Sequence, residues 1–266
     1  MSTLFERLTA PGAWPLLACL TARVGGLFLI APLWSLSAMP RTVRTALVIL
    51  ISLALLPAAT PTGVPTDPVG MPLTFATELA IGLAIGLTAA ALVQGVALAG
   101  EVISTQMGLQ MAPLLAPLPE VQQSGLAQLQ TLLAIAIYAR LDGHLHLLRG
   151  LAASLRVLPP GVLLHPAGMV ASVTGIGATL CGTAVGAAAP GMATLLLTQL
   201  ALAVLSRAVP QLNAMMVSLP LAAACGLVMF GLSLPIVGGV LGRGAAALPD
   251  HLGFVLRALA PAVRGH

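Results

Sequence analysis

The chain has no lysine and little charge of either sign. Charged residues make up 7% of its 266 residues, and all eleven basic residues are arginine. A soluble domain needs roughly 25% charged residues to keep its surface in water, so the composition excludes an ordinary soluble protein. The net charge of +4 is small and scattered along the chain. A nucleic-acid partner is therefore not expected, because such proteins gather basic residues on one face.

Sequence patterns for catalysis and metal binding are also lacking. The three cysteines, Cys19, Cys181 and Cys225, stand singly in apolar stretches, which excludes a CxxC metal or redox motif and indicates small core residues. The chain has no HExxH, no GxSxG and no lysine for a phosphate-binding loop. His144 and His146 are two positions apart, so on a helix they point to different faces. We predict a protein that is not an enzyme and has no cofactor.

Long apolar runs dominate what is present. Hydrophobic residues are 58% of the chain, and the mean hydropathy is +1.04. The runs are continuous rather than alternating, which favours helices over a membrane barrel. At ~20 residues per crossing, the chain has length for about six to eight spans. We predict an all-α, polytopic integral membrane protein that contacts lipid and forms one membrane domain over residues 1–266.

Apolar runs and their interruptions predict the individual helices. Residues 158–206 should form two helices, because Pro190 and Gly191 interrupt the run. After the last apolar run, residues 243–266 should form a short basic tail. Arg41 and Arg44 should lie on the cytoplasmic side. The other apolar runs are residues 12–39, 45–59, 73–110, 124–139 and 211–242.

Residues 140–158 predict an amphipathic helix. Leucines recur there at spacings of three and four, whereas Arg149 and Arg156 lie off this stripe. Asp142 should cap the helix N-terminus, and Pro159, Pro160 and Gly161 should end it. The predicted apolar stripe is Leu145, Leu148, Leu151, Leu155 and Leu158.

Four ionisable residues interrupt the apolar segments: Arg23, Glu78, Glu101 and Arg207. Such groups are costly in a membrane and are functional candidates. One interpretation is a proton or ion relay of a secondary transporter that uses Glu78 or Glu101. The other, which we favour, is buried ion pairs or polar contacts that fix the register of helices between subunits.

Small residues four positions apart indicate close approach of helix backbones, within this chain or against a partner. The pairs are Gly82/Gly86, Gly182/Gly186 and Gly238/Gly242.

Residues 207–227 also carry the polar side chains of Arg207, Gln211 and Asn213, next to Pro210, inside a strongly apolar region. Lipid offers no partner to these groups, so they should face protein or a water-filled cavity. We predict that Gln211 and Asn213 make hydrogen bonds between subunits, with Arg207 and Pro210 part of the same contact.

Residues 111–123 are mostly apolar but contain Pro113, Pro117 and Pro119, which exclude a regular helix interior. An apolar, non-helical segment between membrane helices indicates a loop inside an assembly. Flexible methionines gather nearby, and they either form a deformable gasket or fill the core. These methionines are Met107, Met111, Met215 and Met216.

Several motifs in order resemble the FliR family of flagellar export-gate proteins, whose injectisome counterpart is SctT. They are RVGGLFLIAPLWS, MPRTVRTAL, ELAIGLAIG, AGEVISTQMGL, DGHLHLLRGLAASLRVLPPG and RAVPQLNAMMVSLPLAAACGL, which together extend from residue 23 to 227. The sequence departs from the family where Ala116 and Pro117 replace a common Asp-Pro pair.

The resemblance implies a fold like a fusion of FliP-like and FliQ-like helical hairpins. It implies a subunit that joins FliP-like and FliQ-like proteins, near FlhB-like and FlhA-like proteins, in the inner membrane at the flagellar basal body. Unfolded flagellar subunits would pass through that gate. Residues 108–123 correspond to a loop that plugs the closed channel, here with Met111, Pro113, Leu114, Leu115 and Pro117. The alternatives are an SctT-type injectisome subunit and a stand-alone transporter.

Overall fold

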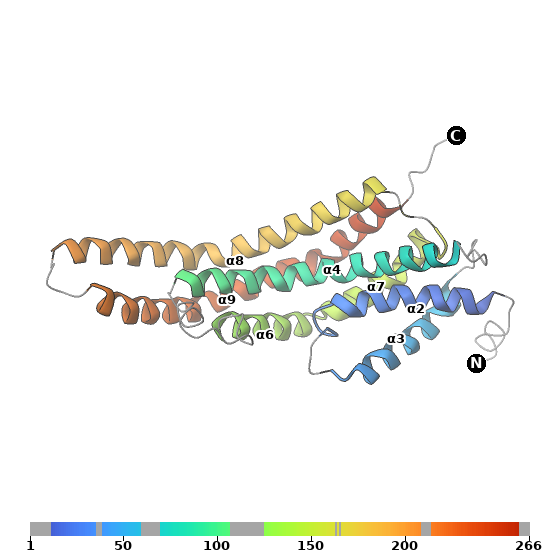
Figure 1. The fold of residues 1–266 in the computed structure, drawn as a ribbon, viewed down its shortest axis with the longest axis horizontal. Coiled ribbons are helices and arrows are strands. Elements are labelled where there is room, and N and C mark those ends of the chain that lie inside the picture. Colours follow the sequence, from blue (N-terminus) through green and yellow to red (C-terminus); the bar gives the residue numbers. More distant parts are fainter. Residues whose placement is uncertain are drawn as a thin grey trace. The chain divides into compact units, whose positions relative to one another are not determined.

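The computed structural model describes residues 12–35, 39–59, 70–106, 125–162, 164, 166–208 and 214–260. Every regular element within these residues is helical, so the predicted all-α class is confirmed (Figure 1). In chain order the elements are α2 (Ala13–Ile30), α3 (Arg41–Leu55), the 3-10 turn η1 (Leu56–Ala58), α4 (Gly70–Gln106), α6 (Gly125–Arg140), α7 (Gly143–Val157), α8 (Pro166–Ala208) and α9 (Ala214–Leu259).

Within the described ranges, five helices are long and apolar enough to cross a membrane, which confirms the polytopic membrane class. They are Ala13–Ile30, Arg41–Ala58, Gly70–Gln106, Ala167–Ala201 and Ala224–Leu259. This is fewer than the six to eight spans that length alone allows, because α4, α8 and α9 each use far more than ~20 residues.

The break predicted at Pro190 is wrong, since α8 continues through it from Pro166 to Ala208. A proline removes only one helical hydrogen bond, and apolar surroundings offer the remaining backbone groups no better partners. Thr194 donates its hydroxyl to the Pro190 carbonyl at 2.9 Å, four positions back along the same helix.

The predicted tail also differs from the structure, because α9 continues through Arg243 and ends at Leu259. Leu248, Leu252 and Leu256 recur every four positions there and are all buried. This apolar stripe explains why the segment is helical despite its charges.

The helices form two compact units. The first contains residues 1–91, 142–178 and 246–266, and the second contains residues 92–141 and 179–245. In the first unit α2 packs against α3 and η1, and Phe28 stacks on Trp34 with ring centroids 4.5 Å apart. A buried core cluster joins α2, η1 and α7 through Leu16, Leu20, Leu56, Ala59 and Leu155.

Glycines bring α2 and α4 together within the first unit. A Cβ on Gly82 would lie 3.0 Å from the backbone nitrogen of Leu27 and would overlap the Arg23 carbonyl. A Cβ on Gly86 would lie 3.0 Å from the Leu27 carbonyl oxygen. The pair Gly82/Gly86 is therefore a contact between helices of this chain, as small residues four apart permit.

The other two glycine pairs, both in the second unit, behave differently. Nothing lies within 4 Å of a Cβ built on Gly182, Gly238 or Gly242, and Gly186 meets only Val240, at 4.0 Å. Close packing in this unit occurs instead at Gly100, where a Cβ would lie 2.7 Å from Gln130 Oε1. Spacing alone thus did not identify which glycines pack.

Several helices leave most of their apolar surface uncovered by the chain itself. In the most apolar stretch of Arg41–Ala58 only 11% is buried, and in that of Ala167–Ala201 only 22%. Leu197 and Leu200 on α8 are each 67% exposed. Such faces need lipid or a partner protein to cover them.

Candidate functional site

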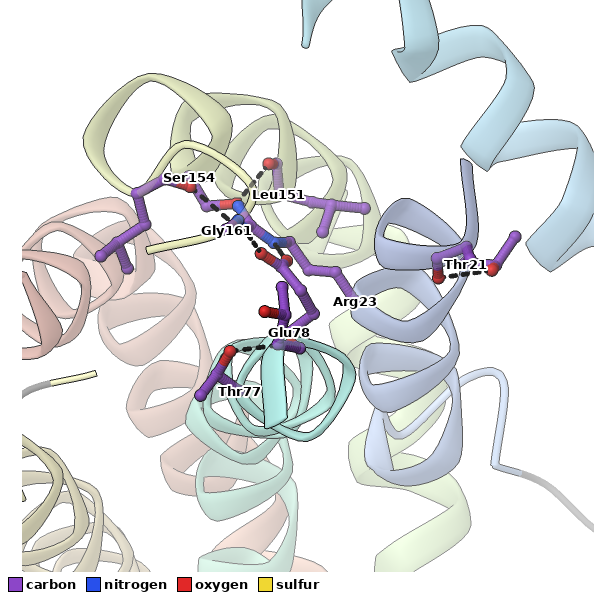
Figure 2. Close-up of polar contacts among 10 residues, drawn as sticks. Thr21, Arg23, Thr77, Glu78, Leu151, Ser154 and Gly161 are labelled. Carbon is purple, nitrogen blue, oxygen red and sulfur yellow. Dashed lines mark hydrogen bonds and ion pairs between the residues drawn. The ribbon is translucent and has the colours of Figure 1, made fainter. Parts of the chain in front are cut away.

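A buried ion pair lies within the first unit. Arg23 of α2 and Glu78 of α4 meet with Arg23 Nε 2.6 Å from Glu78 Oε2, and neither side chain is accessible to solvent. Figure 2 shows the two side chains pointing toward each other from separate helices. The sequence analysis expected both residues to make contacts between subunits, whereas the structure shows that they pair with each other within this chain.

The remaining nitrogens of Arg23 bind the end of α7. Nη1 donates to the Ser154 hydroxyl at 3.0 Å, and Nη2 donates to the Leu158 carbonyl at 2.9 Å. Ser154 in turn donates to the Leu151 carbonyl at 2.7 Å (Figure 2). All three guanidinium nitrogens are therefore engaged, which matches the fork of donors that arginine presents.

Glu78 is satisfied on both oxygens. Oε2 accepts from Arg23, and Oε1 accepts from the backbone nitrogen of Gly161 at 3.2 Å. Gly161 has φ +100°, a left-handed conformation that glycine adopts without strain. The turn after α7 is thereby tied to α4, and we call Arg23, Glu78, Ser154, Leu158 and Gly161 the Arg23 network.

Local structure explains why these groups converge. The last carbonyls of a helix have no partner within the helix, and a cation near the C-terminus also interacts favourably with the helix dipole. Arg23 supplies both a donor and a positive charge at the C-terminus of α7, which ends at Val157. The Arg23 network thus joins α2, α4 and α7 in one fixed arrangement.

The chemistry of this network is that of a structural connection. No thiol or hydroxyl nucleophile is paired with a free base in this network, because the Glu78 carboxylate already accepts hydrogen bonds from Arg23 and Gly161. In the part of the chain that the structure describes, no group of three His, Cys, Asp or Glu is arranged to hold a metal ion. Removing one partner of such a buried pair is strongly destabilising, at about 3–5 kcal/mol.

Sequence reasoning missed Ser154 and Gly161 as members of the network. A signal was present, because Ser154 falls on the buried face of α7 with Leu147, Leu151 and Leu155. A lone hydroxyl in a buried stripe must find a polar partner. The turn at Gly161 was recognised only as a helix stop.

Helix α7 confirms the predicted amphipathic helix with two corrections. Leu145 is 38% exposed, and Leu147 lies on the buried face in its place. Asp142 is at the N-cap, but it adopts φ 55° and makes no side-chain capping hydrogen bond. The interpretation of all three cysteines as core residues also fails for Cys181, which is exposed.

Glu101 does not join the Arg23 network. It is half-buried on the part of α4 that belongs to the second unit, and about six helical turns separate it from Glu78. Near it, the side-chain amide of Gln199 donates to Gln106 Oε1 at 3.2 Å and to the Gln106 carbonyl at 3.3 Å.

The remaining predicted site residues fall where the structure describes little. Arg207 belongs to α8, and Met215 and Met216 belong to α9; the structure describes the backbone of these residues but not their side chains. Outside the described residues altogether are Met107, Met111, Pro113, Leu114, Leu115, Pro117, Pro210, Gln211 and Asn213.

Comparison with known proteins gives one consistent result. The family model described as bacterial export proteins, family 1, matches residues 14–247. The flagellar biosynthetic protein FliR of Escherichia coli (strain K12) is 29% identical over 224 residues, which is 84% of each chain. The FliR of Pectobacterium carotovorum subsp. carotovorum is 28% identical over the same shares. The FliR of Aquifex aeolicus (strain VF5) is 31% identical over 153 residues, 55% of this chain and 56% of that one.

Proposed function

This chain belongs to the bacterial export proteins, family 1, and we propose that it is a non-enzymatic subunit of the flagellar type III protein-export gate. The observation that carries the proposal is the family match over residues 14–247, together with relatives named as flagellar FliR over 84% of the chain. The proposed location is the bacterial inner membrane, at the flagellar basal body.

In this proposal the chain assembles with FliP-like and FliQ-like subunits into a closed channel, with FlhB-like and FlhA-like proteins nearby. Unfolded flagellar subunits are the cargo. The uncovered apolar faces of α3 and α8 support such an assembly. A chain that leaves most of two long apolar helices uncovered has room for partner helices as well as lipid.

Residues 108–123 act as the plug of the closed channel in this proposal. Their proline-broken, apolar sequence suits an interior loop. Met111, Pro113, Leu114, Leu115 and Pro117 would fill the path until export begins. Met107, Met215 and Met216 would form the deformable seal around it.

The transporter alternative is less well supported. Glu78 is wholly buried and hydrogen-bonded on both oxygens, so binding a proton would break the Arg23 network. Glu101 lies about six helical turns away on α4. A coupling site usually brings its ionisable groups to one cavity. An injectisome role is also less favoured, since the relatives found carry flagellar names.

The test is co-expression of the tagged chain with the FliP-like and FliQ-like proteins of the same organism, followed by detergent purification and mass measurement. We expect a stable hetero-oligomer. The matched control is the same chain expressed without the two partners. A well-folded chain that purifies alone in both cases, and that moves a solute across liposomes, would replace this proposal with the transporter function.

A further inference from the structure

A groove between α7 and the last part of α9 has no role in the proposed function. Its volume is about 420 Å³, and every lining residue belongs to the first unit. The two helices meet closely beside it, because a Cβ on Gly150 would lie 2.7 Å from Leu252 Cδ1. The lining residues are His146, Arg149, Gly150, Ala153, Val157, Pro249, Leu252, Gly253, Leu256 and Arg257.

The groove combines positive charge with an apolar floor. Arg149 on α7 and Arg257 on α9 are both exposed, and the half-buried His146 lies one turn from Arg149. No carboxylate is among the lining residues. Among the residues that the structure describes, neither Arg149 nor Arg257 forms an ion pair, so the two groove arginines are open to an anion.

The floor beneath these arginines consists of side chains without polar atoms. Ala153, Val157, Leu252 and Leu256 line it, and Gly253 adds no side chain. Arg257 lies along the groove wall, because a Cβ on Gly253 would be 3.4 Å from Arg257 Nη2. A peptide would bring backbone N–H and C=O groups to this floor without hydrogen-bond partners, whereas an acyl chain would not.

The position along the helices also suits a lipid. The groove lies at the C-terminal end of the apolar stretch Ala224–Leu259 of α9. Its other wall, α7, is a 15-residue amphipathic helix, too short for a crossing but suited to the membrane interface. Lipid phosphates are found at that depth, and basic pockets between helices there bind anionic headgroups.

We propose that this groove binds an anionic phospholipid, with the phosphate held by Arg149 and Arg257 and an acyl chain along Val157, Leu252 and Leu256. The planar guanidinium groups offer paired donors that fit phosphate oxygens. The lipid would cover the gap between α7 and α9 and hold the C-terminal part of α9 at the interface.

The experiment titrates phosphatidylglycerol into the purified full chain and counts bound lipids by native mass spectrometry. At about 1 kcal/mol per arginine, the double variant R149Q/R257Q should bind the tightest lipid roughly 30-fold more weakly. The matched control R41Q/R243Q removes the same charge at two exposed arginines outside the groove and should keep that lipid. Unchanged binding in R149Q/R257Q, or an equal loss in both variants, overturns the proposal.

Two further arms separate a lipid from other anions. Phosphatidylcholine should bind much more weakly than phosphatidylglycerol, and inorganic phosphate or an acidic peptide at the same concentration should not displace the lipid. Displacement by either probe would assign the groove to that anion instead.

Gly253→Leu keeps every charge but fills the floor, so it should weaken lipid binding while circular dichroism shows unchanged helix content. Full binding in this variant would also overturn the proposal.

Discussion

Arg23 Nε and Glu78 Oε2 lie 2.6 Å apart although 55 positions separate the residues in the chain. The pair is completely buried and, with Ser154, Leu158 and Gly161, it connects three helices. Burying two charges costs free energy of solvation, so the pair stabilises the fold only while every donor and acceptor has a partner. The most informative variants are those that leave one member without its partner.

Glu78→Gln should destabilise the chain by about 3–5 kcal/mol, because it leaves the buried Arg23 without its counter-charge. The measurement is chemical unfolding of the purified chain in detergent. The double variant R23M/E78M should cost less than the sum of the two single variants, since it buries no unpaired charge. Arg41→Gln, at an exposed position, serves as the control, with an expected effect within about 0.5 kcal/mol. A loss in Glu78→Gln no larger than this control would show that the pair is not structural.

Gly82→Ala should destabilise the chain, whereas Gly238→Ala should not. A Cβ on Gly82 meets the Arg23 carbonyl and the Leu27 nitrogen, and these backbone atoms cannot move away separately. A Cβ on Gly238 meets nothing within 4 Å, so alanine there should be neutral or stabilise by about 0.5–1 kcal/mol through its better helix propensity. Thermal unfolding of the two purified variants makes the comparison. Equal midpoints would contradict the close contact of α2 and α4.

Tyr138→Phe should leave stability unchanged or raise it by about 1 kcal/mol. Tyr138 is 1% exposed, and its hydroxyl has no hydrogen-bond partner in the region that the structure covers. Burial raises the pKa of this hydroxyl above its ordinary value, so the neutral phenol is what is buried. Phenylalanine removes an unsatisfied polar group at nearly constant shape. A loss above 1 kcal/mol in thermal unfolding would show that the hydroxyl has a hydrogen-bond partner outside the described residues.

Deleting residues 108–123 should raise leakage of ions and small molecules in cells that express the whole gate. The reason is the proposed plug, whose apolar side chains would block the path of the closed channel. Uptake of a small dye that does not cross intact membranes gives the readout. The control is a gate in which a flexible loop of the same length replaces residues 60–69, a proline-rich segment between α3 and α4. A leak equal to that of the control would remove the plug hypothesis.

Gln211→Leu with Asn213→Leu should weaken gate assembly and reduce motility. The amides are proposed to form hydrogen bonds between subunits, at about 1 kcal/mol each or less. Co-purification with the FliP-like and FliQ-like proteins gives the direct measurement. Gln199→Leu is the matched control, because this exposed amide already bonds to Gln106 within the chain. Normal assembly and swimming in the double variant would end the hypothesis.

Helix α8 shows what a local sequence pattern can and cannot predict about a helix. The sequence correctly predicts apolar helix on both sides of Pro190, but it predicts a break where the helix continues. Whether a proline ends a helix depends on which other partners are available to the backbone groups that lose their helical hydrogen bond. The solvent or protein around the helix decides this. The extension of α9 to Leu259 has the same origin, because packing of Leu252 and Leu256 stabilises a charged segment as helix.

The sequence by itself determined the class of this protein: an all-α membrane protein of an export family, with Arg23 and Glu78 as charges that need partners. Hydropathy, helix-forming runs and ordered motifs are properties of neighbouring residues, so they can be recognised without a fold. Only the tertiary structure decided that these two charges pair with each other, that Ser154 and Gly161 complete the network, and that Gly82 rather than Gly238 is a packing glycine. Each of these depends on contacts between helices that are distant in sequence, and local patterns restrict such contacts only weakly.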